Sequence, residues 1–253
     1  MSIASELKLI APATIPEVRP EDCLATLITE ACLRENIPWN SQSVVVIAQK
    51  IVSKAEGAIV DLRTLQPSVR AESYAREHDK DARLVELVLR QSRRIVRMER
   101  GLIISETRHG FVCANAGVDR SNVPGEHFAT VLPEDPDASA RAVQKGLLER
   151  TGLDIAVVIT DTFGRAWRVG LVNVAIGVAG FQPVENLQGQ TDREGRPLNA
   201  TSPAIADEIA AAAGLLMAKN AGRPVVIVEG LSLRVSEATA TQLVRSPEDD
   251  LFR

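Results

Sequence analysis

Short runs of branched aliphatic residues recur along this chain, and each run ends abruptly in polar residues. Residues 43–48, 153–158, 172–180 and 224–230 follow this pattern. Val and Ile favour strands, and apolar runs of this length are typical of buried strands. Because aromatic residues make up only 3% of the chain, its core has to be built mainly from Val, Ile, Leu and Ala.

Helical patterns separate these strands without alternating strictly with them. We expect helices over residues 21–36, 139–151 and 203–219, and one or two more over residues 68–94. No glycine fingerprint of a dinucleotide-binding fold follows a strand. The sequence therefore predicts an α+β fold with mixed or antiparallel sheets and packed helices.

The segment near residues 60–100 interrupts strand-rich sequence with helical, charged sequence. Arginines spaced by three and four residues form a basic stripe if the last helix of this segment continues through them. The alternative to a functional stripe is an ordinary solvated helix face. These arginines are Arg90, Arg93, Arg94 and Arg97. We expect one domain over residues 1–253, or two subdomains of it separated by this helix-rich insertion.

Strand patterns return immediately after this segment. Residues 102–106 and 110–114 flank the polar residues 107–109, which predicts a hairpin. Further along, the glycines in residues 172–180 suggest a strand that another part of the backbone approaches closely. Residues 185–198 are polar and rich in glycine, so we expect a loop there.

Composition excludes several classes of function. A net charge of −4 gives no electrostatic basis for general nucleic-acid binding. No apolar run reaches the length of a membrane span, and the N-terminal residues do not have the pattern of a signal peptide. The three cysteines have no metal-binding spacing. Cys23 and Cys32 are expected on one helix, as residues of the protein core and not as metal ligands. These features favour a cytoplasmic protein with reduced thiols.

Two polar segments carry the candidate chemistry. Asp161, Thr162, Arg165 and Arg168 follow one predicted strand within eight residues, and Asp119 follows another. Carboxylates and hydroxyls are hard oxygen ligands for a divalent cation, and arginine pairs with phosphate in a fork. We expect Asp119 and Asp161 to converge on one divalent ion just past their strands.

Other polar residues are less specific. Lys50 and Lys54 follow the strand over residues 43–48 and could neutralise phosphate, although a surface turn is the alternative. His109 could act as a base or be a polar turn residue. No arrangement typical of a serine nucleophile is visible, so catalysis by positioning and charge stabilisation is expected.

Five of these segments together resemble the coenzyme F-420-0:L-glutamate ligase family, the gamma-glutamyl ligases of F-420 biosynthesis. The matching runs are residues 53–57, 109–122, 161–168, 175–180 and 250–253, and the resemblance begins near Ile15. It implies a stand-alone ligase without the nitroreductase-like domain of some members. It also implies an intertwined homodimer of α+β subunits.

The resemblance implies a GTP-dependent amide ligation. GTP would phosphorylate the lactyl carboxylate of coenzyme F-420-0, L-glutamate would attack the acyl phosphate, and GDP and phosphate would leave. Further glutamates could follow through gamma linkages. Magnesium or manganese at two sites, with potassium as an aid, would support the reaction.

The same resemblance assigns roles by motif. Asp119 and Asp161 would bind the first metal and Thr162 the second. The place of Arg165 and Arg168 beside Asp161, and not the resemblance, leads us to expect them to contact the anionic acceptor in preference to the stripe over residues 90–97. Asp119, Asp161, Arg165 and Arg168 are thus the expected catalytic residues. The nucleotide would be bound by Ile15, Pro16, Glu17, Val18, Gln49, Lys54, Asn122, Met217, Lys219 and Gly222, within a pocket completed by residues 216–223.

The chain departs from the family pattern at three places. An expected arginine is absent from residues 185–189, residues 171–173 replace a Gln-Thr-Asp run, and Lys50 replaces a small hydroxyl residue. These changes leave two alternatives open beside the leading hypothesis. One is a related nucleotide-dependent amide ligase with a different carboxylate acceptor, and the other is a nucleotide-binding protein without catalysis.

Overall fold

The computed structural model describes residues 6–123 and 125–251, and its centre is a five-stranded mixed sheet. Across the sheet, β2 and β8 run parallel, and the other neighbouring pairs are antiparallel. The expected mixed sheet is therefore confirmed. In spatial order, the strands are β1 (Lys8–Ile10), β10 (Val225–Glu229), β2 (Val44–Ala48), β8 (Ala156–Arg165) and β9 (Arg168–Ala179).

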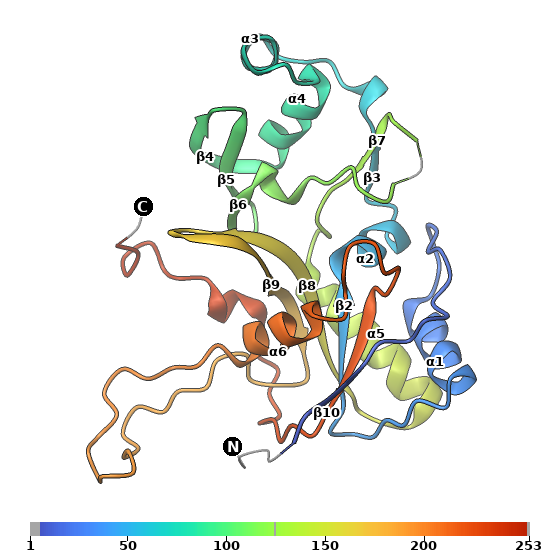
Figure 1. The fold of residues 1–253 in the computed structure, drawn as a ribbon, viewed down its shortest axis with the longest axis vertical. Coiled ribbons are helices and arrows are strands. Elements are labelled where there is room, and N and C mark those ends of the chain that lie inside the picture. The colour runs from blue at the N-terminus through green and yellow to red at the C-terminus, as the bar shows by residue number, and fades with distance from the viewer. Residues whose placement is uncertain (1–5, 124, 252–253) are drawn as a thin grey trace.

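Helices cover both faces of this sheet (Figure 1). On one face lie α1 (Leu24–Arg34), α2 (Gln49–Ala55) and α5 (Pro136–Thr151), and on the other lies α6 (Ile205–Gly214). Successive residues of β2 alternate between the two cores. A strand buried on both faces needs apolar residues at every position, which explains the unbroken aliphatic runs of the sequence.

A second group of elements lies beside the main sheet and has hydrophobic clusters of its own. The strands β4 (Ser92–Glu99), β5 (Leu102–Thr107) and β6 (Val112–Ala114) form one small sheet, and β3 (Ile59–Asp61) and β7 (Phe128–Thr130) form another. The predicted hairpin of β5 and β6 is confirmed by their antiparallel pairing. Whether this group is a separate subdomain stays a prediction.

Two helices complete this second group, and the described residues also contain three short 3-10 turns. The helices α3 (Val69–His78) and α4 (Ala82–Gln91) begin where the side chains of Ser68 and Asp81 accept hydrogen bonds from the first turn. The turns are η1 (Leu62–Thr64), η2 (Asn115–Gly117) and η3 (Ala240–Leu243). Among the described residues, no helix has both the length and the apolar character needed to cross a membrane.

The predicted helical stripe of arginines is wrong. Helix α4 ends at Gln91, and Arg93, Arg94 and Arg97 lie on strand β4. The pairing of β4 with β5 overrides the helical pattern, because Arg93 and Arg94 there form ion pairs with the buried carboxylate of Glu106. A spacing of three and four residues is shared by helices and by irregular, bulged strands, so it could not decide between them.

The expectation for the cysteines holds for only one of the two. Cys32 is buried within α1, whereas Cys23 precedes the helix and is exposed. Helix α1 begins at Leu24, three residues later than the sequence pattern suggested. The short polar segment before Leu24 therefore belongs to the loop and not to the helix.

Strand β9 packs directly against the start of α5, as the glycines of residues 172–180 suggested. A Cβ atom at Gly177 would lie 2.3 Å from the carbonyl oxygen of Pro136. A side chain there would collide with the backbone. Only glycine allows the strand and the helix to approach this closely.

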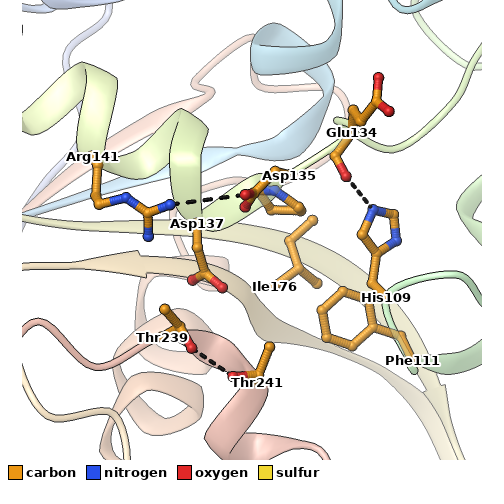
Figure 2. Close-up of a pocket in the computed structure, with 10 residues that line it drawn as sticks. His109, Phe111, Glu134, Asp135, Asp137, Arg141, Ile176, Thr239 and Thr241 are labelled. Carbon is orange, nitrogen blue, oxygen red and sulfur yellow. Dashed lines mark hydrogen bonds and ion pairs between the residues drawn. The ribbon is translucent and has the colours of Figure 1, made fainter.

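Asp137 lies in the first turn of α5, near Thr239 and Thr241 of the C-terminal segment (Figure 2), and its hydrogen bonds fasten β9 and this segment to the helix. Its side chain is buried, and Oδ1 accepts hydrogen bonds from the backbone N–H of Val178 at 2.8 Å and of Ala240 at 2.9 Å. One carboxylate thus serves two segments more than 60 residues apart in sequence. Hydrogen bonds to a charged acceptor are stronger than those between neutral groups.

We expect Asp137→Ala to lower the free energy of unfolding by about 2–5 kcal/mol, because two buried N–H groups lose their acceptor. Urea unfolding followed by circular dichroism would measure the change. Asp137→Asn keeps an acceptor oxygen and should lose much less. Glu149→Ala, an exposed substitution on the same helix, is the control. Equal stability of Asp137→Ala and Glu149→Ala would contradict this role for Asp137.

Glu86 joins the two helices of the second group in a similar way. Its buried carboxylate accepts a hydrogen bond from Arg90 Nε at 2.8 Å and another from the backbone N–H of Ser68 at 3.0 Å. Hydrogen bonds from Arg90 and Ser68 lower the pKa of Glu86 to about 2. The ionised form is therefore bound more favourably in the folded protein than in the unfolded chain.

This lowered pKa predicts how the stability depends on pH. Because the folded-state pKa is lowered, the contribution of Glu86 is fully present above the unfolded-state pKa of about 4.3 and is lost as the pH falls towards 2. The difference in unfolding free energy between wild type and Glu86→Gln should therefore shrink over this window. Glu72→Gln on α3, whose side chain is exposed, is the control. A difference that stays constant with pH would contradict the assignment.

Candidate functional site

The candidate site lies where β8 continues beyond the end of its parallel neighbour. Ala48, the last residue of β2, pairs with Thr160, and the chain then turns directly into α2. From Asp161 to Arg165, β8 pairs with β9 alone among the described strands. A cavity of about 1180 Å³ opens at the edge of β8 that β2 leaves uncovered.

The sequence placed both aspartates just past strands, and this is wrong for Asp161. Asp161 lies within β8, opposite Val174 of β9. The hairpin with β9 keeps β8 extended for five residues after the polar segment begins. Asp119 does lie outside the regular strands, after β6 and η2, and one isolated bridge pairs it with Thr130.

The cavity brings together nearly all of the residues that the sequence singled out. These residues come from segments far apart in the chain. They meet around the end of β2 and the part of β8 that extends beyond it. The lining includes Ile15, Pro16, Glu17, Val18, Gln49, Lys54, Asp119, Asn122, Asp161, Thr162, Arg165, Met217, Lys219 and Gly222.

Arg168 is the exception among these predicted residues. It is exposed at the start of β9, opposite Arg165 at the end of the hairpin, and it is not part of the cavity lining. Arg165 does line the cavity, and its Nη2 donates a hydrogen bond to the carbonyl oxygen of Val169 at 2.7 Å. The two arginines, which sequence reasoning treated together, are therefore not equivalent.

Asp119 is held by a lysine and a serine. Lys50 Nζ lies 2.8 Å from Asp119 Oδ2, and Ser121 donates hydrogen bonds from its backbone N–H at 2.7 Å and from Oγ at 2.9 Å. Burial raises the pKa of Asp119, but the hydrogen bonds from Lys50 and Ser121 outweigh it and bring the pKa below its usual value. Asp119 is thus an ionised, oriented carboxylate.

Asp161 is in a different electrostatic environment. The pKa of Asp161 is raised to about 6, mainly by burial and also by the negative charge of Asp119, while the backbone N–H of Thr162 and the charges of Lys50 and Lys219 partly offset this rise. Two carboxylates that interact in a partly buried cavity repel each other. A cation bound between them would relieve this repulsion.

The hydroxyl of Thr162 is also oriented. Its Oγ1 donates a hydrogen bond to Oδ1 of Asn173 at 2.9 Å, and Nδ2 of Asn173 contacts the sulfur of Met217 at 3.8 Å. With its proton engaged, Thr162 Oγ1 keeps its lone pairs available for a ligand. Sequence reasoning missed this role of Asn173. The hairpin register, which places Asn173 opposite Thr162, is the signal that would have found it.

Besides Arg165, the cavity is lined by cations from α2 and from the loop before β10. Lys50 and Lys54 lie one turn apart on α2, so the surface turn considered for them is in fact a helix. Lys54 is buried and forms an ion pair with Glu17. In the described part of the chain, no ion pair is recorded for Lys219 or Arg223, which line the same cavity.

His109 lies elsewhere. Its Nε2 is 3.0 Å from the carbonyl oxygen of Pro133 and 3.1 Å from that of Glu134, and its ring stacks on Phe111 (Figure 2). Burial lowers the pKa of His109. The residue lines a smaller cavity beside the N-terminus of α5 and not the main one. Its position favours a structural role over the catalytic base considered from the sequence.

The oxygen donors of the main cavity suit a particular kind of cation. Within residues 6–123 and 125–251, no group of three or more His, Cys, Asp and Glu side chains could hold a metal ion. Asp119, Asp161 and Thr162 supply two carboxylates and one hydroxyl. A hard divalent ion that keeps several waters and binds substrate phosphates needs no more from the protein.

Fold and cavity together define a class of site: a cleft in an α+β protein. Its carboxylate and hydroxyl oxygens can hold a metal ion, and this ion and the lysines can bind an anionic substrate. Comparison with known proteins then gives the family. The F420-0:Gamma-glutamyl ligase model matches residues 13–230, so the chain belongs to this family.

Curated relatives extend this match over almost the whole chain. A protein named Coenzyme F420:L-glutamate ligase from Methanothermobacter thermautotrophicus is 45% identical over 251 residues, which cover 98% of this chain and 99% of the relative. Proteins of the same name from Methanopyrus kandleri and Methanocaldococcus jannaschii are 44% and 38% identical. The first covers 94% of both chains, and the second covers 85% of this chain and 86% of the relative.

Proposed function

We propose that this protein adds L-glutamate to the carboxylate of coenzyme F420-0 and uses GTP to drive the reaction. Family membership and the names of the relatives support the glutamate ligation. The observation that carries the proposal is the single cavity that joins Asp119 and Asp161 to lysines from two separate segments. Its volume of about 1180 Å³ leaves room for a nucleotide and a second substrate together.

The chemistry explains why a phosphoryl donor is needed. A carboxylate is a poor electrophile, so the γ-phosphoryl group of GTP is first transferred to a carboxylate oxygen of the acceptor. The amine of L-glutamate then attacks the acyl carbon of this acyl phosphate. A C–N bond forms, the C–O bond to phosphate breaks, and the amine loses a proton. The free carboxylate of the product can accept further gamma-linked glutamates in the same way.

The carboxylates of the cavity are proposed as metal ligands. Asp119 and Asp161 would hold one Mg²⁺ or Mn²⁺ ion, and Thr162 would contribute to a second site. Such ions neutralise charge on phosphate oxygens during phosphoryl transfer. Lys50 holds Asp119 in a fixed orientation, and Asn173 does the same for Thr162. Potassium is proposed as an additional aid, without an assigned ligand.

The nucleotide is proposed to bind beside the cations of α2 and of the loop before β10. Lys54, Lys219 and Arg223 can offset the charge of its phosphates. Gln49, Asn122 and the loop over residues 15–18 line the same cavity and are proposed as further contacts of the nucleotide. The remaining predicted contacts, Met217 and Gly222, belong to the loop that carries Lys219.

The acceptor is an anion, and Arg165 is the proposed contact for its phosphodiester. The sequence assigned this role to Arg165 and Arg168 jointly. Since only Arg165 lines the cavity, the proposal now rests on Arg165. A ligase with a different carboxylate acceptor stays an alternative, and so does a nucleotide-binding protein without catalysis.

Product analysis tests the proposal and separates these alternatives. The purified protein is incubated with GTP, Mn²⁺, L-glutamate and coenzyme F420-0, and mass spectrometry follows the mass of the acceptor. Glutamylated F420-0 with release of GDP supports the proposal. GTP hydrolysis that depends on another carboxylate would favour a different acceptor, and GTP binding without any turnover would favour the non-catalytic alternative.

We expect Asp161→Asn to reduce turnover by roughly a hundredfold or more, because a neutral amide stabilises a metal–phosphate complex much less than a carboxylate does. The steady-state rate of GDP release would measure the loss. Asn has nearly the same size as Asp, so circular dichroism and thermal unfolding should change little.

Asp154→Asn is the matched control, since Asp154 is exposed and precedes the same strand. Its turnover should equal that of the wild type. Titration calorimetry of GTP with Mn²⁺ adds a second readout for Asp161→Asn. Undiminished Mn²⁺-dependent GTP binding in that variant would show that Asp161 is not a metal ligand.

We propose further that the protein is an intertwined homodimer. Light scattering should then give a mass of about twice 27.3 kDa at micromolar concentration. Trp167 and Val169 at the tip of the β8–β9 hairpin are 82% and 98% exposed, which fits a surface that a second copy could cover. A stable, active monomer at this concentration would contradict the proposal.

A further inference from the structure

One wall of the main cavity is apolar and has no part in the chemistry described above. It is the face of the β5–β6 sheet formed by Leu102, Ile104, Val112 and Ala114, all of which line the cavity. We refer to these four residues as the apolar wall. Ile104 pairs directly with Ala114, and Val112 pairs with Glu106 two residues further along β5.

The two sides of this small sheet differ in their surroundings. Ile103, which points to the opposite side of β5, is 2% exposed and belongs to the core shared with α3 and α4. On the cavity side, Leu102 is 47% exposed and Val112 is 40% exposed. Large aliphatic side chains that line a cavity while staying in contact with water are ready to bind an apolar ligand surface.

The wall lies beside the proposed reaction site. Cys113, next to Val112 on β6, is close enough to Asp161 for the charge of Asp161 to contribute, after burial, to raising the pKa of its thiol to about 12. From the level of Val112 to that of Leu102, the wall extends about 13 Å along β5, at roughly 3.3 Å per residue. It is thus a flat, elongated surface that begins next to the carboxylates.

We propose that the apolar wall binds the flat, fused aromatic ring system of the acceptor coenzyme, a proposal that rests on the function proposed above. The acceptor carries this ring at one end and the carboxylate to be extended at the other. A sheet face presents a planar surface on which such a ring can lie. The ring on the wall and the carboxylate near Asp161 then place the acceptor along the cavity.

The guanine base of the nucleotide is the competing occupant, and the placement of the cations favours the acceptor. The side chains of the wall offer no hydrogen-bond partner to the polar edge of either ring, so the wall can contact only a ring face. Lys54, Lys219 and Arg223 lie in α2 and the loop before β10, with the segments assigned to the nucleotide. The wall belongs to other elements and is left for the second substrate.

The test is a pair of substitutions that make the wall more polar and keep residues that favour strands. Val112→Thr exchanges a methyl group for a hydroxyl, and Leu102→Thr keeps a residue that favours strands. Val96→Thr is the matched control, because Val96 is 39% exposed on β4 of the same small sheet but does not line the cavity. Thermal unfolding of all variants checks that the sheet stays folded.

Titration calorimetry measures the binding of F420-0, and in separate experiments that of GTP with Mn²⁺. The double variant Leu102→Thr/Val112→Thr should bind F420-0 about five- to thirtyfold more weakly, as expected for roughly 40–80 Å² of lost apolar contact. It should bind GTP as the wild type does and should keep its turnover at saturating F420-0. The heat-capacity change on F420-0 binding should become less negative.

The outcomes separate this inference from the function it rests on. If the wild type glutamylates F420-0 and the double variant binds F420-0 with unchanged affinity, the wall is not the ring site and the proposed function stands. If the double variant loses GTP affinity instead, the wall binds the base. If the wild type neither binds nor glutamylates F420-0, the proposed function and the ring site are both wrong.

Discussion

The candidate site depends on one mismatch in strand length. β2 ends at Ala48 and turns into α2, while its parallel neighbour β8 continues for five residues past Thr160. Backbone groups at such an end cannot be paired by the missing strand, so they must be satisfied by the hairpin partner, water or a ligand. β9 supplies this pairing on one side of β8. The other side stays open and forms the floor of the cavity.

This open edge also sets the electrostatics of the site. The mismatch brings Asp161 to a position where only side chains from other segments can balance its charge. Lys50 partly does so, but the same lysine already pairs with Asp119 at 2.8 Å. Burial, together with the nearby charge of Asp119, therefore raises the pKa of Asp161 to about 6. The repulsion between Asp119 and Asp161 lowers the stability of the free protein. It favours binding of a cation together with an anionic substrate, because the cation relieves the repulsion.

The sequence predicted the elements that depend on local pattern. The aliphatic strands, the body of α5 and the β5–β6 hairpin all follow from residue type and spacing, although α5 begins at Pro136, three residues before the expected start at residue 139. It failed where pairing decided the outcome. Arg93 to Arg97 form a strand because β5 lies beside them, and Asp161 stays in β8 because β9 continues opposite to it. No single-segment pattern contains that information.

Much the same division applies to the site. Asp119, Asp161 and Thr162 stood out because their polar runs interrupt apolar sequence, and the structure brings them into one cavity. Asn173 and the apolar wall did not stand out, because an asparagine or a valine in a strand is ordinary until its neighbours are known. Their meaning comes from register: Asn173 lies opposite Thr162, and Ile104 lies opposite Ala114. Polar residues that bind charge can thus be read from a sequence, whereas the surfaces that select between uncharged parts of substrates require the fold.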